Sequence, residues 1–238
     1  MSLPVLETAK HELTLPSQDS QIAFRPFLVK EEKVLLQAME SQNQKQIVNA
    51  LIDIVDACTF GAVNARSLPI FDLEYIFLKI RAKSVGEVAK IRVKCPDDNE
   101  TFAQVELNLD DIDVQVDDSH TNDIMIDEDR KLGIVMQYPT LDSVDVSQDV
   151  KALKTPQLFK LISRGIYQIY EGEKTYAASD YTEKDLNEFI ESMQSNAFAK
   201  VQKFYETMPK LQHEIEVENP KTKVKSMVKL QGLADFFA

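Results

Sequence analysis

The residue types that perform catalysis are few in this chain, and their spacing matches no familiar catalytic or metal-binding pattern. The three histidines, His11, His120 and His213, lie far apart, and none has a second histidine four positions later, as a zinc-protease helix requires. Six separate glycines cannot form a glycine-rich phosphate loop. No serine lies in a glycine-flanked elbow of the hydrolase type. The sequence therefore argues against an enzyme.

The carboxylates are abundant, but they are concentrated in one stretch of the chain. Residues 97–149 contain 16 Asp and Glu and 2 Lys and Arg, a net charge of −14, whereas the whole chain carries −12. The stretch alternates apolar and acidic residues, which is typical of half-buried strands with one solvated face. Such a face either attracts a basic partner or a metal ion, or only keeps the protein soluble. The sequence leaves these alternatives open.

Two kinds of ligand are disfavoured by the same residues. Asp110, Asp111 and Asp113 lack the glycine and the distal glutamate of an EF-hand, so we expect no calcium loop. The acidic balance argues against nucleic acid as the main partner, because phosphate binding requires clustered lysine and arginine.

Composition limits the class of protein further. With 238 residues, 44% of them hydrophobic, the chain can form a sizeable core without disulfides. No apolar run approaches the roughly 18 residues that span a bilayer, and the first ten residues have no secretory signal pattern. Cys58 closes an apolar helical stretch and Cys95 lies in a turn, so we expect reduced thiols in the cytosol.

Apolar periodicity predicts the elements that position these residues. Residues 1–23 are expected to form an extended lead-in to the fold. Strands are predicted at 105–109, 112–116 and 124–126, where apolar and acidic residues alternate. Helices are predicted at 30–39, 47–58, 72–80, 155–169, 182–193 and 198–205. Hairpins are predicted in which 88–94 pairs with 101–107 and 213–217 pairs with 224–230. A further hairpin turn is predicted at 127–129, before the segment 132–137.

The predicted fold class is α+β, with helical N- and C-terminal parts around a strand-rich acidic middle and a C-terminal β-hairpin. The expected parts are 1–110, 111–150 and 151–238, or one compact domain overall.

Exposed aromatic residues are the candidate interface. Phe236 and Phe237 end the chain, where they either dock on their own core or insert into another subunit. Tyr167, Tyr170, Tyr176, Tyr181 and Tyr205 crowd the C-terminal part, and tyrosine is common both at interfaces and at the edge of a core. We take Phe236, Phe237, Tyr205 and Phe27 as candidate contact residues.

Five blocks of the sequence resemble the baseplate hub proteins of T-even-type contractile phages. In chain order they are FRPFLVKEEK at 24–33, LP and FDLEY at 68–75, RAKSVGE at 81–87, FYETMPKL at 204–211 and LQGLADFF at 230–237. The resemblance covers nearly the whole chain. It implies a virion protein of the tail baseplate that is assembled in the host cytoplasm, binds other baseplate or hub proteins, and needs no cofactor and no membrane.

The resemblance also raises the question of a metal. Members of such families often carry Cys-x-x-Cys pairs at hairpin turns, which bind a structural zinc ion. Here Cys95 stands alone with Asp98 three positions later, and the C-terminal hairpin has no cysteine. A closed zinc site needs four ligands, so we predict no metal and a hairpin held by packing.

Three functions follow as hypotheses. The first is a structural subunit of the baseplate hub, and the second is an assembly chaperone for the hub that is absent from the virion. The third is a metal-dependent hydrolase built on the acidic segment, which would bind divalent cations. Copy number in purified particles separates the first two.

Overall fold

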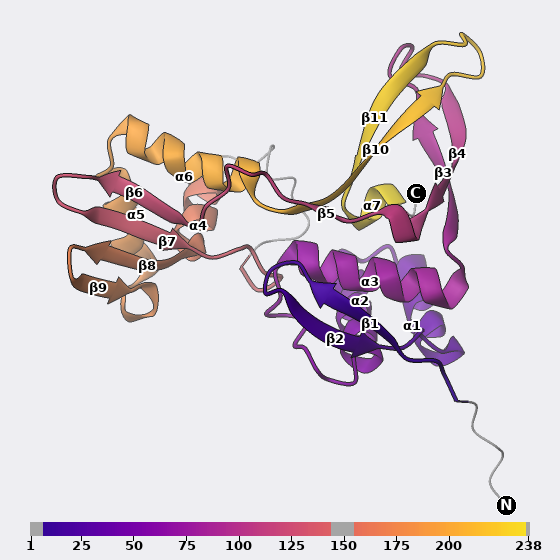
Figure 1. Ribbon diagram of the computed structural model, residues 1–238, viewed down its shortest axis with the longest axis horizontal. Helices are drawn as coiled ribbons and strands as arrows, with labels where there is room; N and C mark the ends of the chain where they lie inside the picture. Colours follow the sequence, from indigo (N-terminus) through magenta and orange to yellow (C-terminus); the bar gives the residue numbers. More distant parts are fainter. Residues whose placement is uncertain (1–6, 144–154, 237–238) are drawn as a thin grey trace, which may run out of the picture. The chain divides into compact units, whose positions relative to one another are not determined.

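The computed structural model describes residues 7–143 and 155–236, and it divides the chain into two compact units (Figure 1). Unit 1 comprises Met1–Gln115 and Lys210–Ala238, and unit 2 comprises Val116–Pro209. The α+β class is confirmed. The division differs from the three parts expected at 1–110, 111–150 and 151–238, because the C-terminal hairpin packs with the N-terminal elements and the acidic segment is shared by both units.

Unit 1 is built around one helix. Its elements are β1 (His11–Leu15), β2 (Ser20–Phe24), α1 (Val29–Glu40), α2 (Gln44–Cys58), α3 (Ile70–Val85), β3 (Val88–Lys94), β4 (Phe102–Asn108), β5 (Val114–Gln115), β10 (Lys210–Glu218), β11 (Lys225–Gln231) and α7 (Gly232–Phe236). Helix α3 is apolar on nearly every side, so it must lie centrally, and its Leu78 and Ala82 belong to the core with residues of β3, β4, β10 and α7. The helix predicted at 72–80 is confirmed and extends to Val85.

The hairpins of unit 1 follow the alternation in the sequence. In β3 the residues alternate between exposed and buried, and the antiparallel register pairs Ile91 with Val105. The predicted C-terminal hairpin is present as β10 and β11, with Ile215 opposite Val228. Strand β5 extends that sheet, because Val114 pairs with Leu211 of β10.

The extended lead-in expected at residues 1–23 is instead a β-hairpin from His11 onward. Strands β1 and β2 pair antiparallel with Leu13 opposite Ile22. The backbone N–H and hydroxyl of Ser17, in the turn, donate to the buried carboxylate of Asp72 in α3. This partner lies 55 residues away, so the sequence near Pro16 gave no local sign of the pairing.

The block beginning at Phe24 joins four elements of unit 1. The guanidinium of Arg25 lies 3.0 Å from a carboxylate oxygen of Glu31, and the second oxygen of Glu31 accepts the backbone N–H of Leu28 at the start of α1. The backbone N–H of Arg25 donates to the carbonyl of Cys58 in α2. The backbone N–H of Phe27 donates to the hydroxyl of Ser84 in α3. The Arg25–Glu31 pair, 12% and 9% exposed, therefore fixes the packing of α1.

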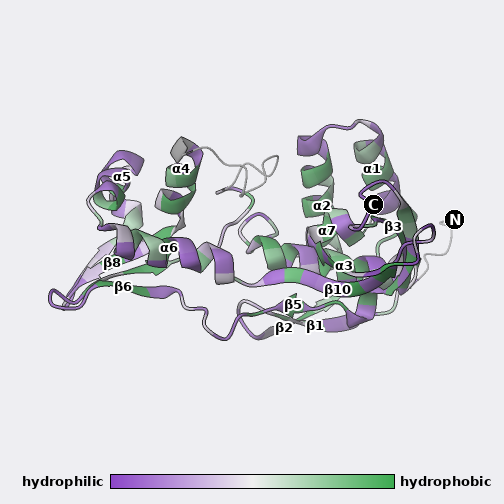
Figure 2. Ribbon diagram, turned by 90° about the horizontal axis from the view of Figure 1, so that it is seen from above, coloured by the Kyte–Doolittle hydropathy of each residue, from purple (hydrophilic) through white to green (hydrophobic). Residues whose placement is uncertain are grey.

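Unit 2 is a four-stranded antiparallel sheet covered on one face by helices (Figures 1 and 2). The strands β6 (Asp123–Asp127), β7 (Leu132–Met136), β8 (Ile166–Glu171) and β9 (Lys174–Ala177) lie in that order. The helices are α4 (Thr155–Gly165), α5 (Glu183–Glu191) and α6 (Ser195–Thr207). The turn expected at 127–129 is confirmed. So is the weak capping signal at Thr182, which forms a full capping box with Asp185.

The helix predicted at 155–169 is confirmed as far as Gly165 and wrong at 166–169. Helix α4 ends at Gly165, and Ile166 begins strand β8. The pairing of β7 with β8 shifts register between Val135 and Met136, so Ile166 and Ile169 both face the core although they are three residues apart. The bulge therefore gives this strand the three-residue spacing of buried side chains that is typical of a helix.

The acidic segment forms strands at the three expected places, but the middle strand is shorter than expected. After β4 the chain makes a 3₁₀ turn at Leu109–Asp111, and the strand expected at 112–116 is reduced to Val114–Gln115. The ammonium of Lys79 accounts for the irregular backbone, because it donates to the carbonyls of Leu109, Asp110 and Ile112 at 3.4, 2.8 and 3.0 Å. Carbonyls held by a side chain do not join a ladder of strands.

No helix of the described residues is long and apolar enough to cross a membrane.

We predict that Arg25→Met destabilises the protein by about 3 kcal/mol, because it removes the guanidinium bound to the buried Glu31 carboxylate and leaves the exposed Lys30 ammonium, at 3.4 Å, as its remaining charged partner. Chemical denaturation followed by circular dichroism measures the loss. The matched control is Arg92→Met at an exposed arginine of β3, which should change the free energy of unfolding by less than about 1 kcal/mol. Equal effects of the two substitutions would contradict the role given to Arg25.

Candidate functional site

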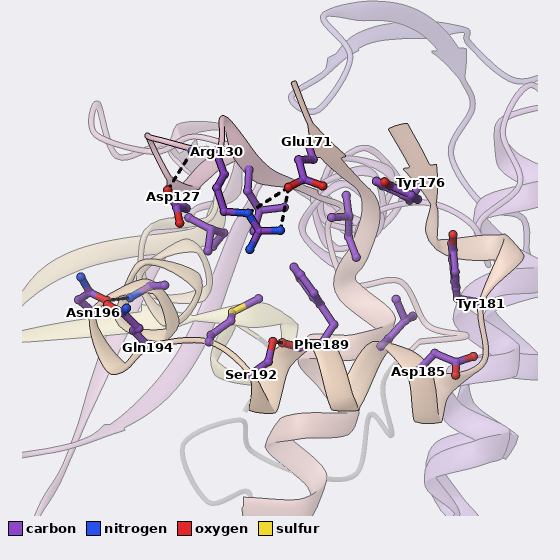
Figure 3. Close-up of a pocket in the computed structure, with 16 residues that line it drawn as sticks. Asp127, Arg130, Glu171, Tyr176, Tyr181, Asp185, Phe189, Ser192, Gln194 and Asn196 are labelled. Atoms are coloured by element: carbon purple, nitrogen blue, oxygen red, sulfur yellow. Dashed lines mark hydrogen bonds and ion pairs between the residues drawn. The ribbon is translucent and has the colours of Figure 1, made fainter. Parts of the chain in front are cut away.

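A groove of about 790 Å³ opens in unit 2 between the sheet and the corner formed by α5 and α6 (Figure 3). The capping box at Thr182 starts α5 in the register that turns Phe189 toward the sheet, and the turn at residues 192–194 leads into α6. The residues that line the groove are Ile126, Asp127, Arg130, Leu132, Ile169, Glu171, Tyr176, Tyr181, Asp185, Leu186, Phe189, Ser192, Met193, Gln194, Asn196 and Ala197.

The floor of the groove is the open end of the core of unit 2. Ile126, Leu132, Phe189 and Met193 are half-buried and pack against fully buried core residues. In Figure 3 Phe189 rises from α5 into the groove, with Arg130 and Glu171 on the opposite wall. The chain itself therefore leaves large apolar side chains only partly covered at this place.

The rim of the groove is charged. Arg130 donates through Nε and Nη2 to one oxygen of Glu171, at 3.0 and 2.7 Å, and this pair raises the pKa of Arg130. One oxygen of Asp127 accepts the backbone N–H of Arg130. Hydrogen bonds from Thr182 lower the pKa of Asp185, which therefore stays charged. Three carboxylates and one guanidinium give the groove a net charge of −2.

The composition of the groove is that of a binding surface. Its described lining contains no cysteine and no histidine, and its serine, Ser192, donates to the carbonyl of Phe189. An apolar floor with a charged rim is the usual composition of a protein contact surface.

Of the candidate residues taken from the sequence, the structure describes Phe236, Tyr205 and Phe27, and none of these three lines the groove. Phe236 is fully buried in the core of unit 1, so its ring docks on its own chain, whereas Phe237 lies outside the described residues. Tyr205 is buried, donates its hydroxyl to the carbonyl of Leu161 at 3.2 Å and has a raised pKa because of burial. Phe27 is half-buried. A contact role for these residues stays a prediction.

The sequence did not predict most residues of the groove, because they come from four strands and two helices that are brought together only by folding. The signal that pointed toward them was the group of tyrosines in the C-terminal part, two of which, Tyr176 and Tyr181, line the groove with ring centroids 6.4 Å apart.

Both cysteines are buried and free, and burial raises the pKa of the Cys58 thiol to about 11. Among the described residues, no group of three or more His, Cys, Asp and Glu is placed to share a metal ion.

Side-chain hydrogen bonds, in addition to packing, join the turns of the β3–β4 and β10–β11 hairpins of unit 1. Asn219, fully buried in the β10–β11 turn, donates through Nδ2 to both carboxylate oxygens of Asp97 in the β3–β4 turn, at 2.9 and 3.1 Å. The hydroxyl of Thr222 donates to the same carboxylate, and these bonds lower the pKa of Asp97. Asp98 accepts from Thr101 within its own turn.

We predict that Asn219→Ala lowers the stability of the protein by about 1–3 kcal/mol, because it removes one of the two side-chain donors to Asp97 and the acceptor of two backbone N–H groups. Urea denaturation measures the loss. The control, Asn49→Ala on the exposed face of α2, should stay within about 0.5 kcal/mol of the wild type. A loss no greater than in the control would show that packing alone holds the turns.

His120 joins the beginning of unit 2 to the end of α6. Its Nδ1 lies 3.0 Å from the Thr207 hydroxyl, and its Nε2 lies 3.1 Å from the Tyr138 hydroxyl. Desolvation lowers the pKa of His120 below the ordinary value of 6.5, against the opposing influence of Asn122 and Asp117. The folded protein therefore favours the neutral imidazole.

We predict that the stability of unit 2 decreases as the pH falls below about 6.5, because the unfolded chain then binds the proton more readily than the folded chain. His120→Gln should remove this component of the pH dependence, measured as the midpoint of urea unfolding between pH 5.5 and 7.5. His213→Gln controls for the loss of an imidazole in unit 1. An unchanged dependence in His120→Gln would contradict the assignment.

Comparison with known proteins gives one family. Searches of curated proteins and of solved structures found no match. The family model described as T4 bacteriophage base plate protein matches residues 8–238, which include both units and all the elements described above. The chain belongs to the family of T4-type phage baseplate proteins.

Proposed function

We propose that this protein is a structural component of the baseplate hub of a contractile tail, and that it acts by binding other proteins during tail assembly. The observation that carries the proposal is the family match, which covers residues 8–238. A binding groove without a catalytic arrangement supports it. The proposed protein is not an enzyme and needs no cofactor.

Its role would be geometric. Each unit has a packed core, and each presents apolar side chains that its own chain leaves exposed or only partly covered. In unit 1 these lie along α1, where Val29, Leu36 and Met39 are 79%, 53% and 52% exposed. In unit 2 they line the groove. Contact with other hub and baseplate proteins in the host cytoplasm would cover these surfaces as the tail is built.

The acidic charge supports association with partners of opposite charge. A net charge of −12 disfavours contact between copies of the chain and keeps the free protein soluble before assembly. It also favours partners with basic surfaces, chiefly by increasing the rate of encounter. Neither nucleic acid nor a membrane is proposed as a partner.

An assembly chaperone of the hub is the alternative. The same open surfaces would serve a protein that binds hub subunits and then leaves.

Quantitative mass spectrometry of purified virions tests the proposal. We expect one to a few copies of the chain per tail, with a strain that lacks the chain forming no complete baseplates. Absence from wild-type particles, together with failed baseplates in the deletion strain, would favour the chaperone. Normal tails in a strain that lacks the chain would contradict both functions.

A further inference from the structure

We propose that the groove of unit 2 binds a segment of another baseplate protein that carries a large apolar side chain next to a lysine or arginine. This inference rests on the proposed function and specifies the chemistry of one contact. It is argued from the incomplete core, from the charges at the rim, and from the charge of the chain itself.

The floor of the groove provides the apolar half of the contact. Phe189, Met193 and Leu132 are packed on one side by the core and are open on the other. A large apolar side chain inserted from outside would continue the core, and its removal from water would favour binding. Tyr181, which is 44% exposed, borders the space and is a residue type enriched at contact centres.

The rim provides the polar half. Among the described lining residues, Arg130 is the one basic side chain, and its guanidinium is already bound to Glu171. Asp127 and Asp185 therefore give the groove an excess of negative charge. Unit 2 as a whole contains 17 acidic and 10 basic residues, a net charge of −7. A lysine or arginine beside the apolar anchor would meet this potential, whereas an acidic segment would be repelled.

A segment of another protein fits the groove better than a second copy does. Two copies, each with a net charge of −12, repel each other, and the groove offers no basic residue free to offset that repulsion. The volume of about 790 Å³ falls within the range of small-molecule pockets as well. A small molecule is therefore an alternative that the experiment must identify.

Photocrosslinking in phage-infected cells tests the inference. A photoreactive phenylalanine analogue replaces Tyr181 in the groove and, in a matched control, Tyr167, which is 60% exposed and does not line the groove. We expect the analogue at position 181 to crosslink to another baseplate protein, at a segment with a large apolar residue within a few positions of a lysine or arginine. The analogue at 167 should not mark that segment.

A pair of identical substitutions tests the charge. Gln194 is exposed, lines the groove and makes no capping bond, so Gln194→Lys adds a positive charge at the rim without removing a contact of the fold. Gln202→Lys makes the same change at an exposed position of α6 away from the groove. We expect Gln194→Lys to reduce the crosslink from position 181 about fivefold and Gln202→Lys to leave it unchanged. In purified baseplates assembled at 0.5 M salt, where screening acts within about 4–5 Å, the reduction should shrink.

The outcomes separate the inference from the proposed function. If the chain is present in baseplates but position 181 gives no crosslink, reaches a second copy or marks a segment without a basic residue, the inference is overturned and the structural role stands. The inference is also overturned if the two lysine variants behave alike. It is overturned as well if native mass spectrometry finds a small molecule bound to the wild type and not to a Tyr181→Ala variant. If the chain is in neither baseplates nor assembly intermediates, the proposed function fails and the inference with it.

Discussion

The burial of α3 on nearly every side is the constraint on which unit 1 depends. A helix that is apolar all round cannot rest at a surface, so the chain must cover each of its faces. It does so with α2, the β1–β2 hairpin, the β10–β11 hairpin and α7, which come from both ends of the sequence (Figure 1). Phe236, near the end of the chain, is fully buried in the same core.

The polar residues of α3 fix the segments that pack around it. The carboxylate of Asp72 accepts a hydrogen bond from the backbone N–H of Ser17 in the turn of the first hairpin. The hydroxyl of Ser84 accepts the backbone N–H of Phe27. Lys79 holds the irregular stretch after β4. Glu74 accepts the backbone N–H of Leu233 at the start of α7, and burial raises the pKa of this carboxyl to about 7. Each bond joins α3 to a segment that no local pattern in the sequence would place there.

Unit 2 is an insertion within unit 1. The chain leaves unit 1 at Gln115 and returns at Lys210, and these two residues are paired across β5 and β10. The groove beside Phe189 is the place where the core of unit 2 stays open.

Elements with local signals could be predicted from the amino-acid order alone. The hairpin around Asn99, the capping box at Thr182 and the central position of α3 follow from turn residues, caps and apolar periodicity, and all three are confirmed. The five sequence blocks also identified the family. The first hairpin, the end of α4 and the groove could not be predicted in this way, because they depend on contacts between residues that are far apart in the sequence. The first hairpin is fixed by Asp72, and the bulge opposite Met136 gives a strand the spacing of a helix. The groove gathers residues from six elements, and a surface made by such distant residues exists only once the chain has folded.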